Sequence, residues 1–316
     1  MKEKILKFGH DKSLLGLLTQ PGRDMGASSI GVVLLNAGIV HRIGPHRLNV
    51  KLARRLARLG APALRFDQSG LGDSPPSRAA VGYEQQAVND VSAAIDAIVA
   101  ETASTSVVLV GMCSGADNAY KTALADERVT GIVLLDPYAY SSREAQFDIA
   151  LRKLFSLEKM KSRFTRIMSS EKTTSAADAE RLSTSPAPED DNNERVAPPL
   201  HAFGRDLQIL SDRNVSILML YTNYVSDLLT RKRHFDHAFA GFGFVQKVDV
   251  DVDPSINHTY TELSAQEKLF ERVLSWIEER SRSEPALDRP DDREGADAIP
   301  KTAPLRVRKY RQASGV

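Results

Sequence analysis

The residue with the clearest chemical potential is Cys113, the single cysteine among 316 residues. It stands at the centre of Gly111-Met112-Cys113-Ser114-Gly115, after an apolar, β-branched run and before residues that favour a helix. A strand, a sharp turn and a helix in this order present a nucleophile at the tip of the turn. The turn strains its central residue and therefore requires small residues two positions before and after it, which Gly111 and Gly115 provide. The spacing predicts a thiol nucleophile.

Two other interpretations of this stretch remain. If Ser114 were the central residue, Met112 would occupy the earlier small position, which is a poor fit. Alternatively, Cys113 is a buried structural cysteine beside an ordinary glycine-rich turn, because free cysteines are commonly buried. The glycine spacing favours the reactive thiol over both.

The elements that must position this thiol alternate between strand and helix, which predicts a mostly parallel sheet with helices on both faces. The expected strands are an opening hairpin at 4–9 and 14–19, followed by 30–35, 63–66, 106–110, 131–135, 216–221 and 245–251. The expected helices begin near Pro45, at 84, directly after the Cys113 turn, at 230 and at 263, the last ending at 280.

The alternation breaks between Asp136 and Ser216. Residues 143–168 have a basic, helical pattern, and residues 169–198 are rich in small and charged residues and in proline. An insertion of this size at the strand ends is expected to form a lid, the alternative being a surface excursion without function. We therefore divide the chain into a core of residues 1–136 and 214–280, a lid insertion at 137–213, and a disordered tail at 281–316.

Composition narrows the class of protein. Hydrophobic residues make up 42% and charged residues 26%, as in ordinary globular proteins, and the formal net charge of +1 gives no support for a nucleic-acid partner. One cysteine excludes an internal disulfide, and no Cys/His spacing suggests zinc, so we expect neither metal nor cofactor. The N-terminus lacks a signal-peptide core, and no segment approaches the roughly 20 apolar residues of a membrane span. These features predict a cytoplasmic protein; its oligomeric state is not indicated.

Three stretches carry a family resemblance: 34–47, 64–74 and 111–116. Together with the element order, they resemble the α/β-hydrolase superfamily over roughly residues 1–280. Within it the chain looks like the serine aminopeptidase-like branch, and like a bacterial subgroup that accompanies exosortase or secondary-metabolite systems. The resemblance implies an α/β-hydrolase fold, in which a mostly parallel central sheet is flanked by helices and carries a helical lid insertion. It also implies hydrolase activity, here with cysteine where serine is usual.

The resemblance also implies the partners of Cys113, because this fold orders its catalytic residues as nucleophile, acid and histidine. His258 follows the last expected strand and precedes the final helix, which is the family's position for the general base. The acid is expected in the loop after strand 216–221, where Asp227 lies. Asp136, at the end of the preceding strand, is an alternative acid position in this fold. A Cys–His pair without an essential acid also remains open, because a thiol is more acidic than a hydroxyl.

An acyl-transfer site further needs two backbone N–H donors for the oxyanion. We expect one from Ser114, directly after the nucleophile, and the other from Ala37 or Gly38 in the loop after strand 30–35. His41 and His46 in the same loop are candidate contacts for a substrate carboxylate or phosphate, the alternative being capping or packing.

These features predict a hydrolase that cleaves an activated ester, lactone or thioester through an acyl-enzyme on Cys113, with a small-molecule or carrier-bound acyl substrate. Peptide bonds are less suitable, because a thiolate leaves the tetrahedral intermediate more readily than an amine does. One alternative is an acyltransferase that passes the acyl group to an amine or hydroxyl. Another is a hydrolase-fold binding protein without turnover.

Overall fold

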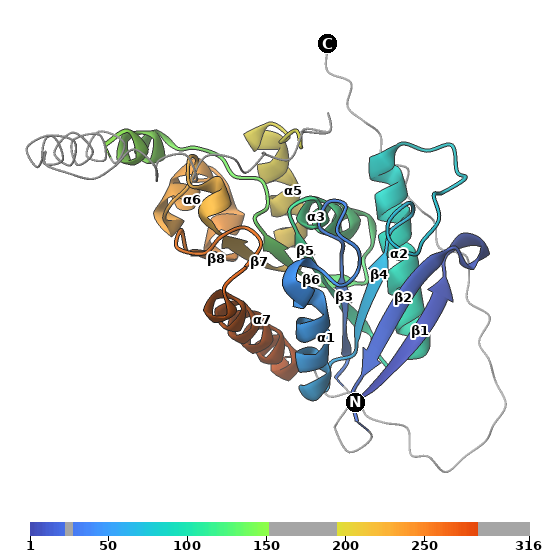
Figure 1. Cartoon of the computed structure of the whole chain (residues 1–316). Coiled ribbons are helices and arrows are strands. Elements are labelled where there is room, and N and C mark those ends of the chain that lie inside the picture. The colour runs from blue at the N-terminus through green and yellow to red at the C-terminus, as the bar shows by residue number, and fades with distance from the viewer. Residues whose placement is uncertain (23–27, 152–194, 284–316) are drawn as a thin grey trace, which may run out of the picture.

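The computed structural model describes residues 1–22, 28–151 and 195–283. Its centre is an eight-stranded sheet in the order β1-β2-β4-β3-β5-β6-β7-β8 (Figure 1). The β1–β2 and β2–β4 pairs are antiparallel, and all later pairs are parallel. The strands are β1 (Lys2–Phe8), β2 (Leu14–Gln20), β3 (Ile30–Leu34), β4 (Ala63–Asp67), β5 (Ser106–Met112), β6 (Val129–Leu135), β7 (Ser216–Tyr221) and β8 (Asp249–Val252).

Helices cover both faces of this sheet (Figure 1). The α-helices are α1 (Leu48–Arg58), α2 (Tyr83–Glu101), α3 (Ser114–Ala125), α5 (Leu200–Asp212), α6 (Lys232–Ala238) and α7 (Leu263–Ser283). The short 3₁₀ helices are η1 (His10–Lys12), η2 (Pro45–Arg47), η3 (Asn223–Val225) and η4 (Gly243–Gln246). The expected fold class, an α/β-hydrolase fold with a mostly parallel sheet between helices, is confirmed.

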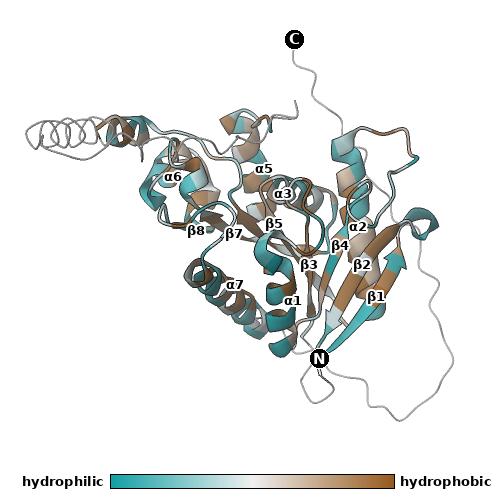
Figure 2. Ribbon diagram, viewed as in Figure 1, coloured by the Kyte–Doolittle hydropathy of each residue, from teal (hydrophilic) through white to brown (hydrophobic). Residues whose placement is uncertain are grey.

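Two apolar clusters hold the layers together. One joins the sheet to α2, α3, α5 and α6 and includes Ile95, Tyr120 and Phe203. The other joins the opposite face to α1 and α7 and includes Leu52 and Trp276. Strands β3 and β5 are buried along their whole length, as expected of parallel strands covered on both faces. Figure 2 shows this pattern as apolar strands beneath helices whose outer faces are hydrophilic.

The sequence pattern misplaced two elements near the C-terminal half. The expected strand at 245–251 is instead η4 followed by the shorter strand β8. Phe244 and Val245 are buried by packing rather than by pairing, and the Phe244 ring lies 5.6 Å from that of Phe239. Helix α5 was not expected at all. It begins after Pro199 inside the predicted insertion, and it packs on the core through its apolar face, Phe203, Leu207 and Leu210.

The predicted insertion is described only at its two ends. Residues 143–151 are helical, as expected, whereas the expectations for 152–194 and for the tail from 284 onward lie outside the described residues. Helix α7 runs to Ser283 rather than ending at 280. The helical residues 143–151 dock on α6 through charge, since Glu144 pairs with Arg233 and Asp148 pairs with both Arg233 and His234.

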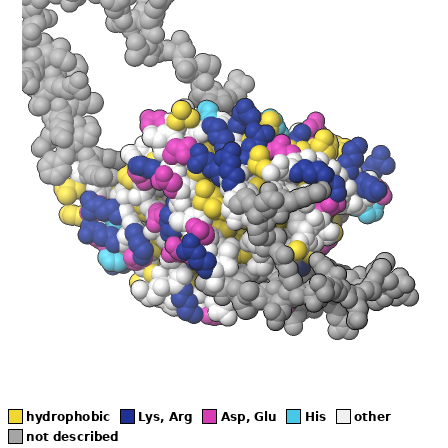
Figure 3. Space-filling model, turned by 90° about the horizontal axis from the view of Figure 1, so that it is seen from below, with side chains coloured by type: hydrophobic (Ala, Val, Ile, Leu, Met, Phe, Trp, Pro, Cys, Tyr) yellow, Lys and Arg dark blue, Asp and Glu magenta, His cyan; other side chains and the backbone are white. Residues whose placement is uncertain are grey.

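Charged side chains of both signs are interspersed on the surface. Figure 3 shows Lys and Arg side chains on one face with Asp and Glu side chains among them. Ion pairs between separate elements, such as Arg54–Glu3 and Arg55–Glu267, join many of these groups. Among the helices in the described ranges, none combines the length and apolar character needed to cross a membrane.

Candidate active site

The turn that carries Cys113 links the last residue of β5 to the first residue of α3. Cys113 has φ 55° and ψ −120°, a backbone conformation that non-glycine residues rarely adopt. A Cβ on Gly111 would lie 2.1 Å from the carbonyl oxygen of Gly115, and a Cβ on Gly115 would lie 2.3 Å from that of Asn36. Both glycines are therefore required by close backbone approach. The Cys113 N–H donates to the Leu135 carbonyl over 2.9 Å, which fixes the turn to β6.

His258 lies in the loop after β8 and faces the thiol. Its Nδ1 is 2.6 Å from Asp136 Oδ2, and its other ring nitrogen is left to make the hydrogen bond with Cys113. The ring of Tyr224 stacks on the imidazole, with centroids 4.1 Å apart and planes at 23°. The His258 side chain is 25% exposed, so the cluster of Cys113, His258 and Asp136 is accessible to solvent at this residue.

Asp136 is the carboxylate at His258. It follows β6, is fully buried and has φ 47°. Thr222, directly after β7, donates its N–H to Asp136 Oδ1 over 2.7 Å and its hydroxyl to Oδ2 over 2.6 Å. These bonds and the contact with His258 compensate the charge of a carboxylate removed from water.

The carboxylate that contacts His258 is therefore Asp136, the alternative position, and not Asp227, which the sequence analysis preferred. Asp227 is exposed in the loop after η3, whereas β6 and β7 are adjacent parallel strands whose carboxyl ends place Asp136 and Thr222 side by side. His258 reaches the same edge of the sheet. The family's usual acid position after β7 is thus taken by Thr222, which supports the carboxylate instead of supplying it.

The protonation equilibria of Cys113 and His258 are shifted in opposite directions. Burial alone would lower the pKa of His258, but its hydrogen bonds with Asp136 and Cys113 and the charges of both raise that pKa to about 9. Burial would raise the pKa of Cys113, but the hydrogen bond with His258 and the positive charge of Arg195 lower it below its ordinary value. Both shifts favour a thiolate beside an imidazolium.

Of the three residues predicted to form the oxyanion hole, Ser114 directly follows Cys113 and is bonded to Gly38, which Ala37 precedes. The Ser114 backbone N–H bonds to Cys113, and Ala37 packs with Cys113 against the same apolar cluster. Gly38 has φ +53°, and its N–H donates to Ser114 Oγ over 2.8 Å. A substrate oxygen would have to replace that hydroxyl in order to use the Gly38 donor.

The two histidines of the loop after β3 have other surroundings. His41 is exposed. His46 is also exposed, and its Nε2 lies 3.4 Å from Thr261 Oγ1, in the loop that carries His258. Contacts to a substrate carboxylate or phosphate therefore remain predictions for both residues.

Polar contacts that the sequence analysis did not predict hold the loop after β3, in which the oxyanion donors are expected (here called the oxyanion loop). Asn36 donates to the Val40 carbonyl over 3.0 Å and accepts from the Gln68 N–H over 2.9 Å. The Arg42 N–H donates to Asp67 Oδ1 over 2.6 Å, and its guanidinium pairs with the same carboxylate. Asp67 is the last residue of β4, and nothing in the sequence pattern pairs it with a loop 25 residues earlier.

The sequence analysis missed three further residues that contact Asp136 or His258: Thr222, Tyr224 and Arg195. Thr222 carries a usable signal, because it directly follows a central parallel strand, where functional groups gather. Tyr224 lies in the loop in which only carboxylates were sought. Arg195 carries no local signal, since it lies in a proline-spotted polar segment far along the chain from every residue that it contacts.

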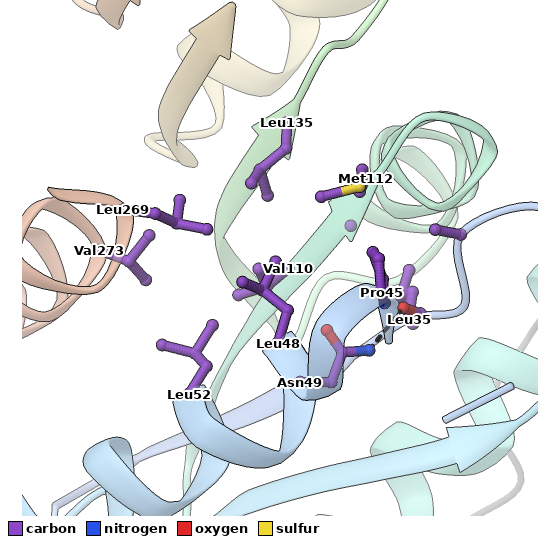
Figure 4. Close-up of a pocket in the computed structure, with 12 residues that line it drawn as sticks. Leu35, Pro45, Leu48, Asn49, Leu52, Val110, Met112, Leu135, Leu269 and Val273 are labelled. Atoms are coloured by element: carbon purple, nitrogen blue, oxygen red, sulfur yellow. Dashed lines mark hydrogen bonds between the residues drawn. The ribbon is translucent and has the colours of Figure 1, made fainter. Parts of the chain in front are cut away.

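A small apolar pocket lies behind the turn that carries Cys113, between α1 and α7 (Figure 4). Leu48 and Leu52 line it from α1, and Leu269 and Val273 line it from α7. Its described lining includes Met112 but neither Cys113 nor His258. We therefore attribute this pocket to the packing of the core and not to the chemistry of the site.

The sheet order, the strained turn after β5 and the Cys113–His258–Asp136 contacts define an α/β-hydrolase. The profile of the Hydrolase_4 family, described as serine aminopeptidase S33, matches residues 31–194, and the chain belongs to this family. Comparison with curated protein sequences finds no significant match.

Solved structures share the fold at low sequence identity. An esterase from Pyrococcus furiosus is 14% identical, with a TM-score of 0.51, over 88% of this chain and 92% of its own. A hypothetical protein from Pseudomonas aeruginosa is 16% identical, with a TM-score of 0.51, over 88% and 92%. DcsB, solved in complex with its substrate analogue, is 13% identical, with a TM-score of 0.53, over 88% and 99%. The likeness extends across the fold in each case.

Proposed function

We propose that this α/β-hydrolase cleaves activated esters, lactones or thioesters through an acyl-enzyme on Cys113, with His258 as the base and Asp136 as the acid that orients it. The observation that carries the proposal is the placement of Cys113. Its strained backbone, φ 55° and ψ −120°, presents the sulfur at the tip of the turn, where it bonds to a histidine that is itself bonded to a buried carboxylate.

The reaction begins from the ion pair in which the proton of Cys113 is held on the ring nitrogen of His258 that faces the sulfur. The thiolate sulfur then forms a bond to the carbonyl carbon, and the electron pair of the C=O bond moves to oxygen. The N–H groups of Ser114 and Gly38 stabilise that oxyanion. When the intermediate collapses, the bond to the leaving group breaks, and the leaving group takes the proton held by His258.

Water completes the cycle. His258 removes a proton from the water molecule as its oxygen attacks the thioester carbon, and the carbon–sulfur bond then breaks to release the acid and restore the thiolate. Asp136 keeps the imidazole in one orientation and stabilises its protonated form in both half-reactions. Esters and thioesters suit this nucleophile better than amides, because the first intermediate must expel a group that leaves at least as readily as a thiolate.

The finer placement of the protein rests on its sequence. The resemblance of residues 34–47, 64–74 and 111–116 supports the exosortase- or secondary-metabolite-associated bacterial subgroup. A single nucleophilic thiol and no second cysteine favour a cytoplasmic location, where thiols stay reactive.

Intact-protein mass spectrometry tests the chemistry. Wild type, Cys113→Ala and His258→Ala are incubated with 4-nitrophenyl esters and acyl thioesters of increasing chain length. We expect a mass increase that equals the acyl group, appears on wild type, decays in water and is absent from Cys113→Ala. An adduct that persists until an amine or alcohol is added would identify an acyltransferase. No adduct from any ester, together with a thiol as slow as free cysteine, would favour the binding protein.

A further inference from the structure

Arg195 lies at the point where the chain returns to the core, just before α5. Its side chain is 18% exposed, which is low for an arginine. The guanidinium lies over the ring of Tyr138, 4.5 Å from the ring centroid. A buried cation of this kind needs specific partners, and the identity of those partners indicates its role.

The first partner is Asp117, in the first turn of the helix that follows Cys113. Arg195 Nε donates to Asp117 Oδ2 over 2.6 Å, and Nη2 donates to Oδ1 over 2.5 Å. This is a two-pronged pair, which fixes the plane of the guanidinium as well as its distance from the carboxylate. Lysine has no comparable fork.

The second partner is the backbone of Asp136. Arg195 Nη1 donates to the Asp136 carbonyl over 3.0 Å, while the Asp136 N–H donates to the Leu220 carbonyl over 2.8 Å. Hydrogen bonds thus hold both the N–H and the carbonyl of Asp136, whose φ is 47°. A single guanidinium therefore connects the helix that carries the nucleophile to the residue that orients His258.

We propose that Arg195 is a positioning residue that locks α3, the helix that follows Cys113, against the backbone of Asp136. The inference rests on the proposed function of this site. It goes beyond that function because, among the described contacts, Arg195 forms no hydrogen bond with either reacting group, Cys113 or His258. Among the described residues, the charged groups that influence the thiol are His258, from the loop after β8, and Arg195, before α5. Asp117 and Asp136 balance these two cations.

The electrostatics of the thiol agree with this placement. After burial and the hydrogen bond with His258, the charge of Arg195 is the next largest influence on the Cys113 pKa, and it lowers that pKa. The effect is mutual, since the Cys113 thiolate in turn raises the pKa of Arg195 together with the Asp117 pair.

The test measures the rate at which iodoacetamide alkylates Cys113 as a function of pH, together with the rate of acylation by 4-nitrophenyl acetate. Alkylation requires no turnover, and the chain has one cysteine, so the rate reports this thiol alone. The variants are Arg195→Met, Arg195→Lys and Asp117→Asn. Arg280→Met is the matched control, because Arg280 also pairs with a carboxylate, Asp249, and covers an aromatic ring, that of Trp276.

We expect the alkylation midpoint of Arg195→Met to rise by about one pH unit, which makes the reaction about tenfold slower below the midpoint. Arg195→Lys should restore most of that shift but not the acylation rate, because lysine keeps the charge and loses the fork. Asp117→Asn should leave the alkylation midpoint unchanged or lower it, while it slows acylation. This result would distinguish the effect of the position of Arg195 from the effect of its charge. Arg280→Met should keep the wild-type profile.

An Arg195→Met variant with wild-type alkylation and acylation profiles would overturn the inference. If circular dichroism shows that Arg195→Met does not fold, the Arg195→Lys and Asp117→Asn variants test the inference instead. Acylation at the wild-type rate in both of these variants would contradict a positioning role. Failure of the proposed function has a different signature, since the wild-type thiol itself would then alkylate like free cysteine and form no acyl adduct.

Discussion

At the scale of single residues, the positions of Cys113 and His258 in the fold were predictable, but the carboxylate that contacts the histidine was not. Cys113 and His258 stand in local contexts, a glycine-spaced turn and a loop between the last strand and the last helix, which a sequence pattern displays directly. The acid depends on which strand end lies nearest to the histidine. Asp136 and Asp227 are both carboxylates after parallel strands, and only the packing of β6 beside β7 distinguishes them.

The acid assignment gives the first prediction. Asp136→Asn should lower kcat for an ester substrate by about 10²-fold, because the imidazole loses the partner that orients it and stabilises its charge. Asp227→Asn should leave kcat within about twofold, since a change at an exposed site away from the reacting groups has little effect. Steady-state kinetics of the two purified variants compare them directly. A larger loss for Asp227→Asn would return the acid role to the loop after β7.

The shifted equilibria give a second prediction. Acylation of an alkyl ester needs the thiolate to attack and the imidazolium to protonate the leaving group. Its rate should therefore rise at a pH below the ordinary thiol pKa and fall as pH passes the His258 pKa of about 9. In His258→Ala, the alkylation midpoint of Cys113 should move up toward that of free cysteine. Measurement of kcat/KM and of the alkylation rate between about pH 5 and about pH 10 tests both the rise and the fall of the profile. A wild-type profile that falls near pH 6.5, the ordinary value for histidine, would contradict the raised pKa.

At the scale of elements, the sequence predicts the strands, helices and turns that periodicity and glycine spacing indicate. It misses the elements whose conformation depends on tertiary packing. The central strands and α1, α2 and α7 carry long apolar patterns and were expected near their observed positions. Residues 245 and 246 read as the start of a strand, yet the aromatic cluster around Phe239 and Phe244 holds them in η4. The sequence pattern misses helix α5, which directly follows a long polar segment.

The turn that carries Cys113 provides an element-scale prediction. Gly115→Ala places a Cβ 2.3 Å from the Asn36 carbonyl oxygen, so either α3 or the oxyanion loop must move. A displacement of this kind near reacting groups should lower kcat/KM by about 10²-fold. Gly82→Ala is the control, because a Cβ there meets no atom within 4 Å and its φ is −66°. Kinetics and thermal melting of both variants distinguish damage to the site from a general loss of stability.

At the scale of the whole molecule, the layer arrangement follows from alternating strands and helices, but the ties between loops do not. The polar contacts of Asn36, Arg42 and Asp67 and the Arg195 pair connect residues that are far apart along the chain. Such pairs leave no periodic trace in one sequence. The alternation of strands and helices predicts helices on both faces of the sheet, whereas the polar contacts that align the site could not be predicted.

Global stability should depend strongly on the core beneath α7. Trp276 is fully buried, and its indole N–H donates to Asp249 Oδ2 over 2.8 Å. Trp276→Ala should lower the free energy of unfolding by about 3–5 kcal/mol, through the cavity and the lost transfer energy. Ile209→Ala on α5, where the side chain is 50% exposed, should change it by less than about 0.5 kcal/mol. Urea denaturation measures both, and equal losses would show that this core contributes no more than the surface does.

The single cysteine has a consequence for how this protein withstands peroxide. A thiol whose pKa is lowered by its neighbours is readily converted to a sulfenic acid. No second thiol exists in the 316 residues to condense with that sulfenic acid. Recovery through a disulfide therefore requires a thiol from another molecule, and without recovery a second equivalent of peroxide carries the sulfur to the sulfinic acid and ends its chemistry permanently.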